Sequence, residues 1–406
     1  MEIFIVKLLY LLRPMLNAQL VDWGVLGFDF FELAAILLFL ALAVAFLLKL
    51  LQKTRQPISN VEVWAALLIV WITISYVVHV DISNMSTYAK LVIPPLTFIM
   101  LKRLLPDRSV HIRMLFLMLI GFLLPFIMSA VMTYHGEGLG QVVYWTGLER
   151  YRGVYANIHS MAHNAGFAMM LAITYLMIRQ NETAPLRWIE LSVAATVFLV
   201  GLYLLYAAHV RNVYLGVAIF FFVVTFFYSK RALGIYVLLS IVFVAYFWEA
   251  VAVIFFDVLD PEFFEERASR GGRLGMARQA LDAWSAAPFL NQLTGMGVIM
   301  HGMGQLSGPV LAAVQPWEDP HNDWLYALMS LGLIGLAIII GLFWSIFRAV
   351  LGIRGKEKFA LLGVFLAVVL MNVFSNSYIT RFSMFQMFFM LMVYADLRST
   401  GSEKSI

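Results

Sequence analysis

The sequence predicts an all-α membrane protein that crosses the bilayer eleven or twelve times and carries one long helical loop outside it. Hydrophobic residues make up 62% of the 406 residues, and only 13% are charged, whereas about a quarter of the residues of a soluble domain are charged. Apolar runs of roughly 20 residues, long enough to cross the hydrocarbon core, recur along the chain. This pattern excludes a signal peptide followed by a soluble domain, and we expect no cleavable leader.

The apolar runs define the order of the elements. Residues 1–20 are either a poor first span or a helix at the membrane interface, because Lys7, Arg13 and Pro14 interrupt their apolar character. The spans divide the chain into an N-terminal bundle (1–256), a loop (257–322) and C-terminal helices with a tail (323–406). The predicted spans are 29–49, 61–80, 84–101, 113–133, 157–178, 187–207, 212–228, 232–256, 323–347, 359–377 and 380–397.

Basic residues are distributed unevenly between the two sets of loops. One set holds 17 of the 28, and an excess of Lys and Arg in short loops identifies the cytoplasmic side. The C-terminus is therefore predicted to be cytoplasmic, and the 257–322 loop lies on the opposite side. The seventeen are Lys49, Lys53, Arg55, Lys102, Arg103, Arg108, Arg113, Arg179, Arg187, Lys230, Arg231, Arg348, Arg354, Lys356, Lys358, Arg398 and Lys404.

The opposite side is rich in arginine, and Lys90 is its only lysine. Guanidinium binds phosphate through a planar fork and stays charged when partly desolvated, so this face predicts an anionic ligand. The alternative, for about half of these arginines, is pairing with acidic residues of the loop. The arginines are Arg150, Arg152, Arg211, Arg267, Arg270, Arg273, Arg278 and Arg381, and the acidic residues are Glu262, Glu265, Glu266 and Asp282.

The 257–322 loop has structure of its own. Residues 274–284 are predicted to form an amphipathic helix, because Leu274, Ala277, Leu281 and Trp284 follow one another at spacings of three and four. Glycines and prolines then mark a flexible stretch. A loop of this length is more often a lid or a binding wall than an inert connector, although the inert connector stays open.

His321-Asn322-Asp323 stands at the start of the span predicted at 323–347. Asn322 or Asp323 is suited to cap that helix, and the positive helix end favours anions. An imidazole that titrates near neutral pH can accept a proton from an attacking hydroxyl. The residues alone leave two alternatives for His321, a catalytic base and a water-exposed side chain.

Arg211 lies between two closely spaced apolar spans, at the outer boundary of the membrane. An ionisable group at that depth is costly and marks a functional site, with contact to lipid headgroups as the alternative. Upstream, His159 and His163 are four residues apart and suited to hold a metal. No third ligand is near them in sequence, and the chain has no cysteine, so hydrogen bonding inside the bundle is favoured.

Glycines in the 323–347 span, Gly332 and Gly335, with Gly341 beyond, are predicted to allow close packing of helices. The sequence shows no internal repeat and no sign of an interrupted helix. Both features are typical of transporters, so their absence favours an enzyme over a transporter or flippase that moves an anionic lipid.

Together these segments resemble the O-antigen ligase and O-antigen polymerase superfamily of bacterial envelope glycosyltransferases. His321-Asn322, nine residues, Gly332, two residues and Gly335 resemble the ligase signature. Arg211 with Leu215 is similar to the accompanying Arg-x3-Leu motif. The resemblance covers about residues 60–395.

Two further segments carry the same resemblance. Gly272-Arg273, with Trp284 downstream, resembles the periplasmic loop of the family, and Arg152-Gly153 with Asn157 resembles its upstream arginine segment. The chain departs from the family pattern at His209, where a small serine is common, and at Ile158, where proline usually follows the asparagine.

The resemblance implies an inverting, metal-independent glycosyltransferase without a cofactor, embedded in the bacterial inner membrane with its active site facing the periplasm. The implied donor is a glycan on undecaprenyl diphosphate. The implied acceptor is a sugar hydroxyl of lipid A–core for a ligase or of another glycan for a polymerase, and the ligase-type spacing favours the ligase. No nucleic acid partner is expected, and the membrane lipid surrounds the chain.

The resemblance also assigns roles to single residues. Arg211 and Arg273 would bind the diphosphate, with Arg152 in support, and Arg211 would stabilise the leaving group during catalysis. His321 would be the base for the acceptor hydroxyl or would orient it, and an apolar groove between helices would hold the polyprenyl tail. The supporting residues are Asn322, Asn157 and His209.

Overall fold

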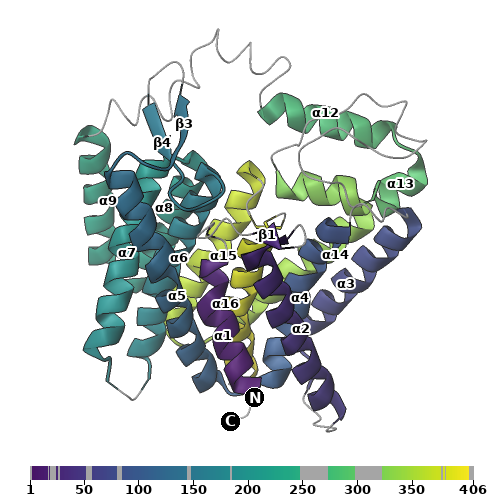
Figure 1. Ribbon diagram of the computed structural model, residues 1–406, viewed down its shortest axis with the longest axis horizontal. Coiled ribbons are helices and arrows are strands. Elements are labelled where there is room, and N and C mark those ends of the chain that lie inside the picture. Colours follow the sequence, from purple (N-terminus) through teal and green to yellow (C-terminus); the bar gives the residue numbers. More distant parts are fainter. Residues whose placement is uncertain are drawn as a thin grey trace.

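The computed structural model describes residues 2–16, 18, 24–25, 28–51, 57–79, 85–143, 148–182, 185–246, 273–297, 322–375, 378–379 and 381–401. Helices make up nearly all of this part and stand side by side as one bundle (Figure 1). The described strands form two small antiparallel hairpins. The predicted all-α architecture is therefore confirmed.

Each predicted span corresponds to one helix. In the N-terminal bundle these are α2 (Phe30–Leu51), α3 (Asn60–His79), α4 (Met85–Leu104), α5 (Arg108–Tyr134), α6 (Ile158–Gln180), α7 (Trp188–Ala208), α8 (Arg211–Tyr228) and α9 (Lys230–Tyr246). In the C-terminal part they are α14 (Asp323–Gly352), α15 (Glu357–Phe374) and α16 (Phe382–Gly401). Among the described residues, α3, α5, α6, α7, α8, α14 and α15 are long and apolar enough to cross a membrane.

The remaining elements are short. Helix α1 (Glu2–Met15) packs along α5 inside the bundle, with Val6 and Tyr10 fully buried, which favours a short buried helix over one that lies flat at the interface. Hairpin β1 (Gly24–Val25) and β2 (Phe28–Asp29) precedes α2, and hairpin β3 (Leu139–Val143) and β4 (Leu148–Tyr151) precedes α6.

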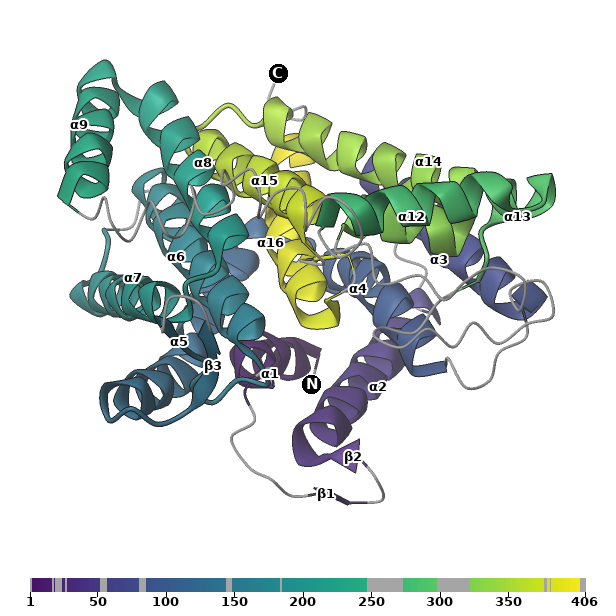
Figure 2. The same cartoon turned by 90° about the horizontal axis from the view of Figure 1, so that it is seen from above.

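The core is centred on α6, whose apolar stretch is 89% buried. Helices α5, α7, α8 and α15 surround it (Figure 2). The outside of the bundle is apolar as well, since Val77, Leu199 and Leu239 are each more than 60% exposed. Extended apolar surface of this kind fits contact with lipid.

One end of the bundle, which we call the basic end, collects the basic loops that are predicted to be cytoplasmic. Lys102 donates to both Glu62 and Asp396, and Arg103 also binds Glu62. Glu62, Lys102 and Asp396 are buried, so removing any one of them would leave an uncompensated charge. This charged cluster (Glu62, Lys102, Arg103, Asp396) ties α3, α4 and α16 together.

Helix α14 is interrupted at Gly332, where φ is 69° and ψ is −173°. The carbonyl groups freed by the interruption are bonded from outside the helix. The backbone N–H of Met296 donates to Met329 at 2.8 Å, and the Trp71 indole donates to Leu331 at 2.9 Å. The expectation that no helix is interrupted is therefore wrong here, because hydropathy does not register a break whose polar groups are bonded within the protein.

Three of the four glycines of α14, Gly332, Gly335 and Gly341, mark close approaches. A Cβ at Gly335 would lie 3.0 Å from the Trp71 ring, and one at Gly341 would lie 2.6 Å from Trp64. The predicted close packing of helices is confirmed at these two positions. At Gly332 the close neighbour is backbone of residues 293–295, outside any long helix.

The loop helices lie alongside the first part of α14 (Figure 2). Helix α12 (Arg273–Ala286) confirms the amphipathic helix predicted at 274–284, and α13 (Phe289–Thr294) follows it. Ala280 of α12 packs with Met296 and with Met329 of α14 in a small apolar cluster. This middle part of the loop is thereby attached to α14.

Candidate active site

The N-termini of α6, α8, α14 and α16 meet at the end of the bundle opposite the basic end. Their C-termini lie at the basic end: Asn181 after α6 binds Glu357, and Arg398 of α16 binds the same carboxylate. Gly352 of α14 lies beside Ser399 of α16, and Tyr228 of α8 lies beneath Lys356. We call the opposite end the site end. Each of these N-termini carries partial positive charge, while α7 and α15 end there and their C-termini carry partial negative charge.

The start of α14 confirms the predicted cap. The side-chain oxygen of Asn322 accepts the N–H groups of Trp324 and Leu325 at 2.9 and 3.0 Å, and its amide donates to Val373 at 2.8 Å. The neighbouring Asp323 is fully buried and has a different task. Its carboxylate accepts the backbone N–H groups of Tyr378 and Ile379, which fixes the turn between α15 and α16 to the start of α14.

His321 lies outside the described residues. Arg273 is the first residue of α12, and its side chain also lies outside the described part. The roles predicted for these two residues therefore stay predictions.

The segment before α6 places two predicted residues at the surface. Asn157 is the N-cap of α6, and its side-chain oxygen accepts the N–H of Ser160 at 2.8 Å. Arg152 is exposed, and its Nη1 donates to the carbonyl of Ala156 at 3.2 Å. Both side chains therefore bind the turn that leads into α6.

His163 lies one level deeper in α6 and is fully buried. Its Nε2 lies 3.5 Å from the side-chain amide of Asn212, and its ring meets the ring of Tyr378 edge-on, with centroids 6.2 Å apart. This contact fits the favoured interpretation of hydrogen bonding inside the bundle. The described residues contain no cluster of three His, Cys, Asp or Glu that could hold a metal ion.

The corner between α7 and α8 places Arg211. His209 has φ 49° and ψ 50°, a left-handed conformation that is uncommon for a residue with a side chain. The chain turns there so that Arg211, which is partly buried, becomes the first residue of α8. This position agrees with the predicted boundary of the span.

His209 itself is buried at this corner. Its burial, and to a lesser degree the positive charge of Arg150, lower its pKa to about 4. The imidazole is therefore neutral near pH 7, and a group with so low a pKa is a weak general base at that pH. We therefore expect His209 to support the site through the turn that its backbone forms before Arg211, and not through proton transfer.

Two arginines that sequence reasoning did not single out also lie at the site end. Arg150 of β4 is half-buried beside His209 and Tyr214, and burial lowers its pKa. Arg381, which precedes α16, donates to the hydroxyl of Ser160 at 3.1 Å. Both belong to the outer arginines of the sequence, but only the fold shows which of them reach toward α6 and α8.

These contacts form one continuous layer, which we call the polar layer. It runs from Asn322 and Asp323 through Tyr378 to His163, and from His163 to Asn212, the neighbour of Arg211. The starts of α14 and α8 are thus joined through α6 and the turn at 372–381. Arg152 lies apart from this layer, on the surface.

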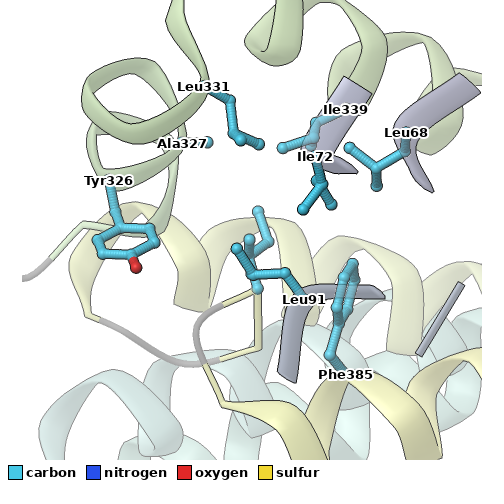
Figure 3. Close-up of a pocket in the computed structure, with 9 residues that line it drawn as sticks. Leu68, Ile72, Leu91, Tyr326, Ala327, Leu331, Ile339 and Phe385 are labelled. Carbon is cyan, nitrogen blue, oxygen red and sulfur yellow. The ribbon is translucent and has the colours of Figure 1, made fainter. Parts of the chain in front are cut away.

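A small apolar pocket lies beside the first turns of α14 (Figure 3). Tyr326 and Leu331 of α14, Ile72 of α3, Leu91 of α4 and Phe385 of α16 line it, and their side chains point toward one another. It offers an apolar surface within reach of the polar layer.

Comparison with known proteins matches one segment of the chain to a family. Residues 195–340 match the family described as O-antigen ligase. This segment is similar to that family, and we call it the O-antigen ligase segment. The predicted resemblance to the O-antigen ligase and polymerase superfamily is thereby confirmed, and no curated protein matches the chain.

The O-antigen ligase segment contains Arg211, Arg273, His321 and the interruption at Gly332. It begins within α7 and ends within α14. The polar-layer residues His163 and Tyr378 lie outside it, so the layer includes segments before and after the matched one.

Proposed function

We propose that this protein is an inverting glycosyltransferase of the O-antigen ligase type. It transfers a glycan from undecaprenyl diphosphate to a sugar hydroxyl of lipid A–core at the periplasmic face of the inner membrane. The observation that carries the proposal is the polar layer, which joins the start of α8, with Arg211, to the start of α14, directly after His321. Both helix starts lie within the O-antigen ligase segment.

The reaction is a single displacement at the anomeric carbon of the donor sugar. The acceptor oxygen forms a bond to C1 while the bond from C1 to the diphosphate oxygen breaks, and the configuration inverts. His321 takes the proton of the acceptor hydroxyl. The electron pair of the broken bond stays with undecaprenyl diphosphate, whose added negative charge Arg211 and Arg273 stabilise, with Arg152 in support.

The described residues of the site support this step through the helix starts and the side chains that fix them. The partial positive charge at the N-terminus of α8 favours a phosphate group bound beside Arg211. Asn322 supports the step by fixing the first turn of α14, Asn157 by capping α6, and His209 by turning the chain before Arg211.

An interrupted helix is typical of transporters, so the interruption of α14 must be weighed against the enzyme. The groups that surround the interruption decide between the two. In transporters, carbonyl groups freed by such a break are free to coordinate ions. Here the carbonyls of residues 329–331 accept hydrogen bonds from Met296, Ser75 and Trp71. The carbonyl groups at the break are therefore bonded within the protein, which favours a structural role for the break over ion coordination. Purified protein that yields no covalent product from donor and acceptor, yet moves the lipid across vesicles, would establish the transporter instead.

A deletion strain is expected to distinguish the ligase from the polymerase. Loss of a ligase leaves lipid A–core without any repeat unit, because no glycan is attached to it. The measurement is a gel of lipopolysaccharide from the deletion strain and from the same strain with the wild-type protein restored. Core that bears a single repeat unit would contradict the ligase assignment and establish a polymerase.

Activity is expected to survive chelation of divalent metals. The proposed chemistry uses guanidinium groups to stabilise the leaving diphosphate, and these stay cationic without a metal. The measurement is the transfer rate of purified protein before and after treatment with EDTA, with less than about a twofold change expected, since no transition-state contact is lost. A loss that added Mg²⁺ or Mn²⁺ reverses would contradict metal independence.

A further inference from the structure

Asp323 is a fully buried carboxylate in the first turn of α14. The N-cap of that helix is its neighbour, Asn322, and the side chain of Asp323 binds a different element. Its Oδ2 accepts the backbone N–H of Tyr378 at 2.9 Å and that of Ile379 at 3.1 Å. A buried carboxylate is costly unless it is hydrogen-bonded, so this contact between α14 and the residues before α16 is a specific feature of the fold.

The start of α14 is bonded both to the end of α15 and to the residues before α16. The amide of Asn322 donates to the carbonyl of Val373 at 2.8 Å. The N–H of Tyr378 is shared between Asp323 and the side-chain oxygen of Asn372, which is 3.0 Å away. Asp323, Asn372 and Tyr378 are fully buried, so water does not compete for these bonds. The first turn of α14 therefore has a fixed place against this segment.

The same segment is in contact with α6. The ring of Tyr378 meets the ring of His163 edge-on, with centroids 6.2 Å apart, and Arg381 donates to the hydroxyl of Ser160 at 3.1 Å. Asp323 thus binds the first turn of α14 to a segment that α6 also contacts. A change in the length of the Asp323 side chain would move that first turn relative to α6.

His321, the predicted base, is two residues before Asp323 in the sequence. The backbone between them is short, because consecutive Cα atoms are only about 3.8 Å apart. A residue that fixes the start of α14 therefore limits where the imidazole can be placed. This limit matters for a reaction, since misplacing a reacting group by about 1 Å can lower the rate by about 100-fold.

We propose that Asp323 is a positioning residue for the proposed transfer reaction. By holding the first turn of α14 against residues 378–379, it sets the place from which His321 reaches the acceptor hydroxyl. The inference rests on the proposed function and adds to it a residue that acts through the backbone and does not touch the substrate. This role depends on the length and the hydrogen bonds of the side chain, and not on its negative charge.

Two variants separate length from charge. Asp323→Asn removes the charge and keeps an oxygen that can accept both N–H groups, so kcat should stay within about threefold of the wild type. Asp323→Glu keeps the charge and lengthens the side chain by one methylene group, so kcat should fall by about tenfold or more. The KM for the lipid-linked donor should change by less than about threefold in both variants, because the contacts to the donor are not altered. The measurement is product formation by purified protein, expressed per folded molecule.

Asp396 supplies the matched control. Its carboxylate is also buried, but it lies at the basic end, where Lys102 and Ser59 donate to it. Asp396→Glu should lower the unfolding temperature, as Asp323→Glu does, and should leave kcat per folded molecule within about twofold of the wild type. The comparison separates positioning from stability, because only positioning changes the rate of the molecules that are folded.

Three results would overturn the inference. The first is an Asp323→Glu variant with the kcat of the wild type. The second is an Asp323→Asn variant that loses as much rate as Asp323→Glu, since the charge would then be what matters. The third is an equal loss of kcat in Asp396→Glu, which would reduce the effect to stability.

His321→Ala separates this inference from the proposed function. Near-normal transfer by His321→Ala would remove the base, and the proposed mechanism would be wrong whatever Asp323 does. If His321→Ala is inactive while Asp323→Glu transfers normally, the proposed function stands and the role of Asp323 is wrong.

Discussion

Replacing Arg211 with alanine is expected to lower the transfer rate by roughly 100-fold or more, while the protein still inserts in the membrane. A preorganised cation that stabilises developing charge on the leaving group typically contributes a few kcal/mol to the barrier. Arg211 is the first residue of α8 and is only partly buried, so truncating it leaves the helix and its packing intact. The measurement is product formation by purified protein with donor and acceptor, alongside its amount in the membrane.

Two further variants sharpen this expectation. Arg211→Lys should fail nearly as badly, because an ammonium group lacks the planar fork that binds two phosphate oxygens at once; full recovery would mean that charge alone matters. His321→Ala should abolish transfer in the same assay. Arg231→Ala removes an exposed arginine at the basic end and serves as the control. Near-normal rates in Arg211→Ala or His321→Ala would remove that residue from the site.

Replacing Gly332 with alanine is expected to destabilise the attachment of α13 to α14 by several kcal/mol. The backbone there has a positive φ with an extended ψ, a region that essentially only glycine occupies, and the strain alone costs about 1–3 kcal/mol. In addition, the new Cβ would lie 2.3 Å from the N of Gly295 and from the carbonyl oxygen of Leu293. Backbone cannot move aside as a flexible side chain can, so residues 293–296 must leave α14.

This change should be visible as faster proteolysis within residues 273–297, a lower unfolding temperature in detergent and reduced transfer, since the start of α14 would move. Gly234→Ala is the matched control, because a Cβ at Gly234 in α9 meets nothing within 4 Å. Alanine there should be neutral or slightly stabilising, as expected for an open position in a helix. Equal protease sensitivity of the two variants would contradict the importance of the break.

The helices could be predicted well from the sequence because in a membrane the hydropathy of a segment almost decides its structure. Each span from 29–49 to 380–397 corresponds to one helix. The cap at Asn322 and the amphipathic helix at 274–284 were also predictable, since each depends on residues within a few positions. Local signals of this kind do not require the fold.

The sequence could not reveal features that depend on distant partners. The break at Gly332 depends on Trp71, Ser75 and Met296, which lie far from it along the chain. The burial of Asp323 depends in the same way on the turn at 378–379. Arg381 looked like any other outer arginine until the fold placed it beside Ser160. The sequence shows how many polar and charged side chains there are, but only the packing of the helices shows which of them are in contact.

The charged cluster at the basic end has a mechanical consequence. Lys102 holds Glu62 of α3 and Asp396 of α16 to α4, so these three helices are clamped together where their buried charges would be costly to separate. Motions that separate these helices should therefore be smallest at the charged cluster and largest at the opposite, site end of the bundle. A long lipid that enters from the bilayer between these helices would therefore meet the least resistance at the site end, where the proposed function places its head group.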